Sequence, residues 1–391
     1  MFAVLSAARK VRGMAVTIFA FLFLVACGVT LPGGFGPTLN LSRPVPVALL
    51  VPGGSSVATD QVLAQSLENA ARLAMSELNG VTIDLRVYST QGDPTIAGRM
   101  ASQAVQDGAK IILGPVYSAN AQAAGRAVAG RGVNVLAFSN NPDIAGRNVY
   151  ILGNTFQNTA NRLVRFSARQ GKSNILIVQG NDRSEAAGAR AIQRAIASSG
   201  ANLAGLVTFD LSQNGVINAV PEISQTVRDT NADAIFMTSG TSGALPFLAG
   251  LLPENGIKPS EVQFIGLQRW DIPASALSIS GLQGGWFALP DPALSEQFSG
   301  RYQATYGTTP HPIAGLAYDG IAAIGALVRA GNADALTSTA LTQSSGFIGV
   351  NGVFRLRPDG TNERGLAVAQ IQNQQVVVID PAPRSFGGVG F

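Results

Sequence analysis

The chain has 391 residues, of which 46% are hydrophobic and 13% charged, and a formal net charge of +4. Residues 1–26 hold three of the 27 basic side chains and none of the 23 acidic ones, so the part from Cys27 onward carries 24 basic and 23 acidic groups. This near-neutral part excludes a polycationic surface for nucleic acid, and its length exceeds what one hydrophobic core usually serves, which predicts two lobes.

The first 26 residues have the pattern of a secretory signal peptide. Three basic residues within 9–12 precede an apolar run over 14–25, which is shorter than the roughly 20 residues that span a bilayer as a helix. Leu24-Val25-Ala26 stands directly before Cys27, the only cysteine, and resembles a bacterial lipobox, in which the cysteine becomes a lipidated N-terminus. The alternative is an ordinary buried cysteine near a plain cleavage site. By the lipobox resemblance, Gly28 in place of aspartate favours the outer membrane, so we expect an exported, lipid-anchored protein that faces the periplasm.

Residues 27–43 are rich in glycine and proline and carry one charge, at Arg43, which predicts a flexible tether. From Pro44 onward, short apolar runs alternate with helical patterns. The strands expected up to residue 152 are 46–51, 81–89, 110–113 and 133–138, and the helices are 60–78, 94–106 and 119–129. The pattern then repeats with strands at 174–178, 203–209, 234–238 and 262–267, and helices at 157–169, 184–198, 217–229 and 245–252. The remaining elements expected are strand 286–289, helices 292–306 and 313–330, and strands 353–356 and 366–371, the last continuing toward 376–379.

This duplicated alternation predicts an α/β fold of two doubly wound parallel-sheet lobes joined by three crossover segments. The crossings are expected in the glycine-containing stretches 152–154, 284–287 and 346–352, since hinge segments must change their backbone angles. The predicted boundaries are 44–152 with 288–345 for lobe 1, 153–287 with 346–380 for lobe 2, and 381–391 for a C-terminal tail.

Small, polar loops follow the predicted strands, at the edge where open parallel sheets bind ligands. These loops are 52–56, 114–120 and 139–141 in lobe 1, and 180–184, 239–242 and 268–271 in lobe 2. For any single loop, a simple helix cap explains the Ser, Thr, Asn and Asp residues. Their convergence on one edge of both lobes predicts a ligand cleft.

Enzyme motifs are mostly missing from the sequence. Gly171-Lys172-Ser173 follows a predicted helix and precedes a strand, which is the reverse of the order that a phosphate loop requires. The single histidine, His311, is followed by Pro312, and no serine has an elbow motif that would make a triad with it. One cysteine excludes an internal disulfide and a cysteine-based zinc site. We therefore expect no catalytic residues, no cofactor and no metal.

Five segments carry a resemblance to a known family: Pro46–Val51 with its Gly/Ser loop, Ile111–Pro115, Val133–Ser139, Ala317-Tyr318-Asp319 and Gly352–Gly360. They resemble the corresponding segments of type I periplasmic binding proteins of the leucine/isoleucine/valine-binding family. The segments Gly360–Leu366 and Asp380–Phe386 are most similar to proteobacterial lipoproteins described as penicillin-binding-protein activators.

The resemblance implies a ligand pocket between the lobes. Ser118, Ala119, Asn120, Ser139 and Asn140 match positions that hold a substrate carboxylate in the family. In lobe 2 the segment 182–186 lacks the tyrosine found in the family, so Trp270 is the candidate stacking face and Asp182 or Asp271 the candidate negative charge. With the loop residues, the predicted ligand-binding set is Ser55, Ser118, Ala119, Asn120, Ser139, Asn140, Asp182, Arg183, Thr241 and Trp270.

Two functions remain open at this point. The first is a non-enzymatic receptor that closes on a small polar, amino-acid-like ligand and presents it to an ABC permease. The second is a lipoprotein that docks on a penicillin-binding protein and regulates cell-wall synthesis. The family activators carry a further helical N-terminal domain, for which residues 28–43 leave no room.

Overall fold

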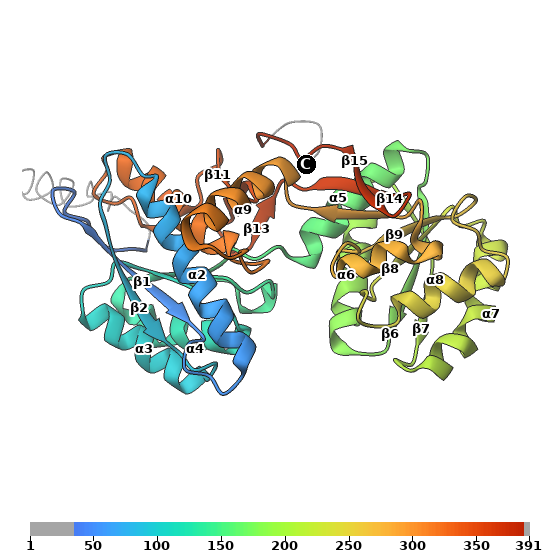
Figure 1. Ribbon diagram of the computed structural model, residues 1–391, viewed down its shortest axis with the longest axis horizontal. Helices are drawn as coiled ribbons and strands as arrows, with labels where there is room; N and C mark the ends of the chain where they lie inside the picture. The colour runs from blue at the N-terminus through green and yellow to red at the C-terminus, as the bar shows by residue number, and fades with distance from the viewer. Residues whose placement is uncertain (1–34, 387–391) are drawn as a thin grey trace, which may run out of the picture. The chain divides into compact units, whose positions relative to one another are not determined.

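A five-stranded parallel sheet forms the centre of lobe 1 (Figure 1). The computed structural model describes residues 35–386, and all elements named below lie in that range. The strands of this sheet are β1 (Val45–Val51), β2 (Ile83–Ser89), β3 (Ile111–Leu113), β4 (Asn134–Ala137) and β5 (Val149–Ile151). Their order is β2-β1-β3-β4-β5, and neighbouring strands run parallel.

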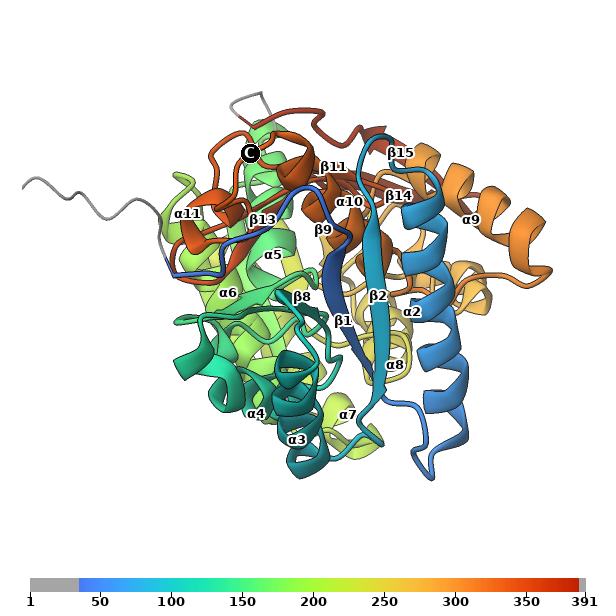
Figure 2. The same ribbon diagram turned by 90° about the vertical axis from the view of Figure 1, so that its left-hand side faces the viewer.

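Helices cover both faces of this sheet. They are α2 (Ala58–Ser76), α3 (Pro94–Gln106), α4 (Ser118–Val128), α9 (Pro292–Tyr306), α10 (Gly315–Arg329) and the short α11 (Ser338–Leu341). Successive side chains of β1 point to opposite faces: Val47 and Leu49 join a core with α2, α9 and α10, whereas Ala48 and Leu50 pack with α3 and α4. Figure 2 shows β1 and β2 side by side, with α2 on one side of them and α3 and α4 on the other.

Lobe 2 is built around a seven-stranded mixed sheet. Its strands are β6 (Asn174–Gly180), β7 (Asn202–Phe209), β8 (Ala234–Met237), β9 (Gln263–Gly266), β10 (Trp286–Leu289), β14 (Ala367–Gln372) and β15 (Gln375–Asp380). The order is β15-β14-β10-β9-β8-β6-β7, and β14 runs antiparallel to both of its neighbours. The parallel strands confirm the predicted fold class, to which this lobe adds an antiparallel edge.

Four helices cover the lobe 2 sheet. They are α5 (Phe156–Arg169), α6 (Arg183–Ala197), α7 (Gln213–Thr230) and α8 (Leu245–Glu254). Alternation along β6 again divides the interior, because Leu176 and Val178 pack with α7 and α8, and Ile175 and Ile177 with α5 and α6. The 3₁₀ turns of the two lobes are Ala129–Arg131, Pro142–Ile144, Ala274–Ser278 and Ser280–Leu282.

The second crossing between the lobes differs from the predicted one. β10 is hydrogen-bonded to β14 as far as Leu289, so the chain leaves lobe 2 after the predicted boundary at 287/288. The reason is that β10 is apolar on both faces: Phe287 and Leu289 enter one lobe 2 core, and Trp286 and Ala288 the other. Helices α9 and α10 then complete lobe 1.

The third crossing also lies later than predicted. Residues 347–364 form a small antiparallel sheet of β11 (Phe347–Gly349), β12 (Gly352–Leu356) and β13 (Asn362–Arg364). Phe347, Phe354 and Leu356 belong to the lobe 1 core, where the two phenylalanine rings contact each other. Lobe 2 therefore resumes at Leu366, and the predicted boundary at 345/346 is wrong.

Residues 35–43 are attached to lobe 1. The Phe35 carbonyl oxygen accepts hydrogen bonds from Ser338 N (2.7 Å) and from Asn134 Nδ2 (3.2 Å). Leu39 is buried, and its N–H donates to the Ala333 carbonyl oxygen at 2.7 Å. The predicted flexible tether is therefore wrong for this part, whereas residues 27–34, with Cys27, lie outside the described residues.

The C-terminal strands form a hairpin where the sequence predicts one continuing strand. Asn373 and Gln374 have positive φ angles of 50° and 62°, and they turn β14 back into β15. Two consecutive positive φ angles suit the turn that matches the twist of a hairpin. No helix within residues 35–386 is long and apolar enough to cross a membrane.

Candidate functional site

Asn362 of β13 joins the third crossing to the first. Its Nδ2 donates to the carbonyl oxygens of Ile151 (2.8 Å) and Gly153 (2.9 Å), and its Oδ1 accepts from Asn158 Nδ2 of α5 (2.6 Å). All of these bonds are buried, so the loss of any one of them would leave an unpaired polar group in the interior, which destabilises the fold. One side chain thus holds the entry to lobe 2 and the exit from the small sheet next to each other.

Arg364 makes a second link at the same place. Its Nε donates to the Leu152 carbonyl oxygen (2.8 Å), its Nη1 to Asp319 Oδ2 of α10 (3.1 Å), and its guanidinium lies over the Phe354 ring. Asp319 also accepts from the Val350 N–H at 2.8 Å. The ion pair is enclosed, which makes it sensitive to the loss of either partner.

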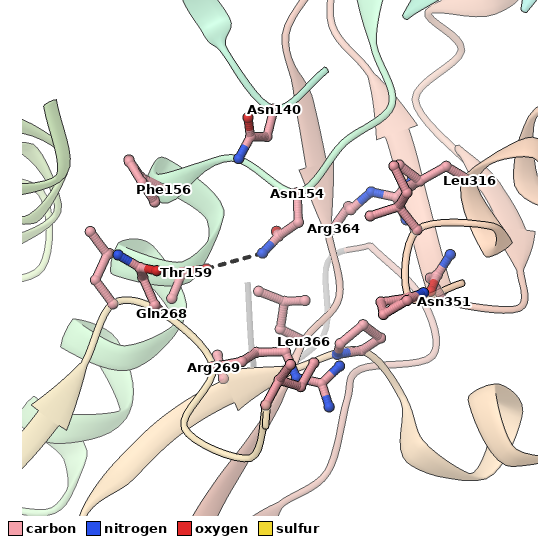
Figure 3. A pocket seen from close by; sticks show the side chains of 16 residues that line it. Asn140, Asn154, Phe156, Thr159, Gln268, Arg269, Leu316, Asn351, Arg364 and Leu366 are labelled. Carbon is pink, nitrogen blue, oxygen red and sulfur yellow. Dashed lines mark hydrogen bonds between the residues drawn. The ribbon is translucent and has the colours of Figure 1, made fainter. Parts of the chain in front are cut away.

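A pocket of about 320 Å³ opens beside these crossings (Figure 3). Both lobes contribute to its walls, since Asn140 follows β4, Gln268 follows β9, and Arg364 and Leu366 flank the third crossing. Its volume is at the lower end of the range for small-molecule sites. The apolar lining residues are Phe156, Leu267, Ile272, Ala288, Pro290, Pro312, Ile313, Leu316 and Leu366. The polar ones are Asn140, Asn154, Thr159, Gln268, Arg269, Asn351 and Arg364.

Internal bonds orient the polar side chains of the pocket. Asn154 Nδ2 donates to Thr159 Oγ1 (3.1 Å), the bond drawn in Figure 3, and Gln268 Nε2 donates to the Thr238 carbonyl oxygen (3.0 Å). Arg269 is held by Asp271, which accepts from Nε at 2.8 Å and also from Nη2. Side chains held in this way are pre-organised for a ligand, which lowers the entropic cost of binding.

Of the predicted ligand-binding residues in lobe 1, Asn140 lines this pocket. Ser139 is buried beside it, and its Oγ accepts from the Asn141 N–H. Ser55 Oγ accepts from the Val57 N–H in the loop after β1. Ser118 and Ala119 begin α4, and Asn120 is 1% exposed with no partner for Nδ2. These positions remain predicted ligand contacts at the carboxyl edge of the sheet.

A tyrosine and a carboxylate lie together near these lobe 1 loops. The Tyr117 hydroxyl donates to Asp60 Oδ1, and this hydrogen bond raises the pKa of Tyr117 to about 12. Asp60 is 4% exposed, whereas the Tyr117 ring is 40% exposed. The pair holds the start of α2 against the start of α4.

Trp270 cannot offer the predicted stacking face in this structure. It has no exposed surface and stacks on Phe287 inside lobe 2, with ring centroids 6.4 Å apart. Gly266 and Gly285 make the space for its ring, because a Cβ at either would lie about 2 Å from it. The ring is therefore part of the lobe 2 core.

The other predicted lobe 2 residues have local partners. Asp182 Oδ1 caps α6 by accepting from the Glu185 N–H at 2.7 Å, and Arg183 is exposed at the first position of that helix. Thr241 Oγ1 donates to the Ile272 carbonyl oxygen at 2.6 Å. Asp271 binds Arg269, so the charge proposed for a ligand already has a partner.

Six polar lining residues were not singled out from the sequence: Asn154, Thr159, Gln268, Arg269, Asn351 and Arg364. Gln268 and Arg269 lie in a loop that the sequence did nominate, next to Trp270. The others belong to or adjoin the crossings. The glycine residues of those segments were the sequence feature that pointed to them. The sequence placed hinges there but gave no sign that the hinge side chains line a pocket.

Comparison with known proteins agrees with this architecture. Residues 44–375 match the family model described as periplasmic binding protein. The chain belongs to the periplasmic binding protein family. Such proteins are exported to the periplasm, which is consistent with the secretory pattern of residues 1–26. Among curated proteins, none matches the chain significantly.

Solved structures of periplasmic binding proteins share the fold. A putative branched-chain amino acid ABC transporter protein from Rhodospirillum rubrum has a TM-score of 0.73 and 17% identity, over 86% of this chain and 100% of its own. A branched-chain amino acid ABC transporter periplasmic ligand-binding protein from Burkholderia xenovorans LB400 has a TM-score of 0.68 and 18% identity, over 89% and 96%. A solute-binding protein from Rhodopseudomonas palustris BisB5, in complex with 3,4-dihydroxy benzoic acid, has a TM-score of 0.59 and 18% identity, over 88% and 97%.

Proposed function

We propose that the protein is a non-enzymatic solute receptor whose two lobes close on a small polar ligand and present it to an ABC permease. The observation that carries this proposal is the pocket at the crossings, because its polar groups come from both lobes: Asn140 and Asn351 from lobe 1, and Gln268 and Arg269 from lobe 2. The similarity to solute-binding structures supports the same function.

Closure follows from differential affinity. A ligand that contacts both lobes binds the closed arrangement more tightly than any arrangement in which one wall is withdrawn, and it shifts the population accordingly. The three crossings are the segments about which the lobes would move, and the bonds of Asn362 and Arg364 would keep the first and third of them together.

Ligand binding is tested with the purified full chain in detergent. Calorimetry and thermal shift against amino acids, small organic acids and peptides should reveal a ligand, and small-angle scattering should show a smaller radius of gyration with it. Asn140→Trp, which places an indole at the pocket wall, should weaken binding at least 100-fold. The matched Asn255→Trp, at the exposed end of α8, should not. A full screen without any binding would refute the receptor function.

We further propose that Cys27 is lipidated and anchors the protein, with the outer membrane favoured by Gly28. Cells that express the chain should incorporate radiolabelled palmitate into it, and Cys27→Ser should abolish the label. Sucrose-gradient fractionation then assigns the membrane. Labelling that survives in the serine variant would contradict the proposal.

The second candidate, regulation of a cell-wall synthase, is favoured by one observation, the outer-membrane sorting expected from Gly28. Such a regulator would work through the exterior of a lobe. Crosslinking of intact envelopes distinguishes the two, because a regulator co-purifies with a penicillin-binding protein, whereas a receptor co-purifies with a permease. The pocket's seven polar side chains support the receptor.

A further inference from the structure

The charged groups that line the pocket are both guanidinium groups. Arg269 and Arg364 are among its lining residues, and no aspartate or glutamate is. The two bonds that Arg269 gives to Asp271 use Nε and Nη2, which leaves Nη1 without a partner among the described residues. An arginine held from behind by a carboxylate presents its remaining N–H groups in a fixed direction, which suits an incoming carboxylate.

Two aspartates that contact lining residues of the pocket are already bound. Asp271 is paired with Arg269, and its side chain is 13% exposed. Asp319 accepts from Arg364 Nη1, from Asn351 Nδ2 and from the Val350 N–H. Neither is free to take the ammonium group of an amino acid, which needs a compensating negative charge when it is removed from water.

In lobe 2 a third carboxylate, Glu185, is also fully used. It is 9% exposed and accepts from the Gly180 N–H and from the hydroxyl groups of Thr238 and Ser239. Asp182 caps α6 and does not line the pocket. No aspartate or glutamate of the lobe 2 loops therefore lines the pocket, and the only one paired with Arg269 among the described residues is Asp271.

We propose that the pocket selects carboxylic acids without an ammonium group and with a branched or aromatic body. The inference rests on the proposed function, since it names the solute class of that site. Arg269 Nη1 would donate to the ligand carboxylate. Phe156, Ile313 and Leu316 would contact the apolar body, and the free amide oxygens of Asn154 and Gln268 would accept from any ligand hydroxyl group.

Matched ligands test the inference by calorimetry on the full chain. L-leucine is compared with 4-methylpentanoate, which has the same carbon chain and no ammonium group, and with L-leucinamide, which has no carboxylate. L-phenylalanine, 3-phenylpropanoate and L-phenylalaninamide form the aromatic series. We expect the acid to bind at least tenfold more tightly than the amino acid in one series or both, and the amides not to bind.

Two variants separate a ligand contact from a structural role. Arg269→Gln should weaken acid binding about tenfold, whereas Arg269→Lys, which keeps the positive charge, should weaken it less. Arg228→Gln, on the exposed face of α7, is the matched charge control. Thermal unfolding of each variant without ligand checks that it folds.

The outcomes for this inference differ from those for the proposed function. Tighter binding of L-leucine or L-phenylalanine than of its acid overturns the inference and leaves the receptor function intact. Acid binding that Arg269→Gln leaves unchanged also overturns it. If none of the six compounds binds, the inference fails, and the broader ligand screen decides the function.

Discussion

The Arg364–Asp319 ion pair lies in the interior, with side-chain exposures of 2% and 0%. Replacing Arg364 by methionine would leave the Asp319 carboxylate with its N–H donors but without a counter-charge. Removal of one partner of a buried pair costs about 3–5 kcal/mol, so we expect Arg364→Met to lower the free energy of unfolding by that amount in urea denaturation.

Two further variants complete this test. Asp319→Asn combined with Arg364→Met should recover much of the loss, because both charges are then removed. Arg301→Gln, which breaks the exposed pair with Glu77, should change stability by less than about 1 kcal/mol. A loss in the double variant equal to the sum of the losses in Arg364→Met and Asp319→Asn would show that the two charges are not coupled.

His311 gives the protein a pH dependence of known sign. Burial lowers the pKa of His311 below its usual value, and its Nδ1 accepts from the Ile313 N–H at 3.3 Å, which requires the unprotonated nitrogen. The unfolded chain therefore takes up this proton first as the pH falls. The contribution of the neutral His311 side chain to the free energy of unfolding is complete above the ordinary histidine pKa of about 6.5. It is lost as the pH falls toward the lower pKa that His311 has in the folded protein.

His311→Asn is the variant that isolates this effect, since the asparagine oxygen can still accept from the Ile313 N–H. We expect the free energy of unfolding of the wild type, measured relative to that of the variant, to decrease between pH 7.5 and pH 5. Urea titrations at each pH measure this difference. A difference that is constant over this range would contradict the expectation.

Trp270 shows why single site residues were hard to predict. Its neighbours Gln268, Arg269 and Asp271 are polar, which suggests an exposed loop, yet the ring is in the core. The space for it comes from Gly266 and Gly285, which lie on either side of it in the chain and meet around it only in the fold. A close packing of this kind depends on the tertiary arrangement and has no local sequence signal.

At the scale of elements, the crossings depend on Asn362. Asn362→Ala would leave the buried carbonyl oxygens of Ile151 and Gly153 and the Asn158 amide unpaired, at a cost of roughly 3 kcal/mol. We expect faster amide hydrogen exchange at 151–154 and 360–364. Asn161→Ala, on α5, loses only the bond from Gln157 and should change stability by less than about 0.5 kcal/mol. Unchanged exchange in the Asn362 variant would show that the crossings are held by other contacts.

Most elements were predictable because hydrophobic periodicity follows local geometry. The errors lie where tertiary context decides. The sequence predicts the strand β10 over 286–289 but assigns its second half to lobe 1; because both of its faces are apolar, all of it belongs to the lobe 2 sheet. The turn at Asn373 and Gln374 has no glycine, so the sequence between β14 and β15 lacks the usual hairpin signal.

At the scale of the whole molecule, each lobe is built from parts of the chain that are far apart. Lobe 1 needs α9, α10 and the small sheet, and lobe 2 needs β14 beside β10. The doubled alternation made the two lobes predictable. The exact boundaries were not, because a crossing is defined by which core its flanking side chains enter.

A chain that ends at Gln343 tests this interdependence. It lacks the small sheet and the last two strands, so Phe347, Phe354 and Leu356 are missing from the lobe 1 core and Val368 and Ile371 from the lobe 2 cores. We expect this variant to lose the cooperative thermal transition in circular dichroism, whereas a chain that ends at Phe386 keeps it. A cooperative transition in the shorter chain would show that one lobe folds alone.

The attachment of residues 35–43 has a mechanical consequence. Phe35 is held beside Asn134, the first residue of β4, whereas Asn140 lies beyond the other end of that strand. A load applied at Phe35 therefore enters lobe 1 at the end of the sheet away from the pocket. In the proposed closure, lobe 2 would move toward lobe 1 without disturbing this attachment.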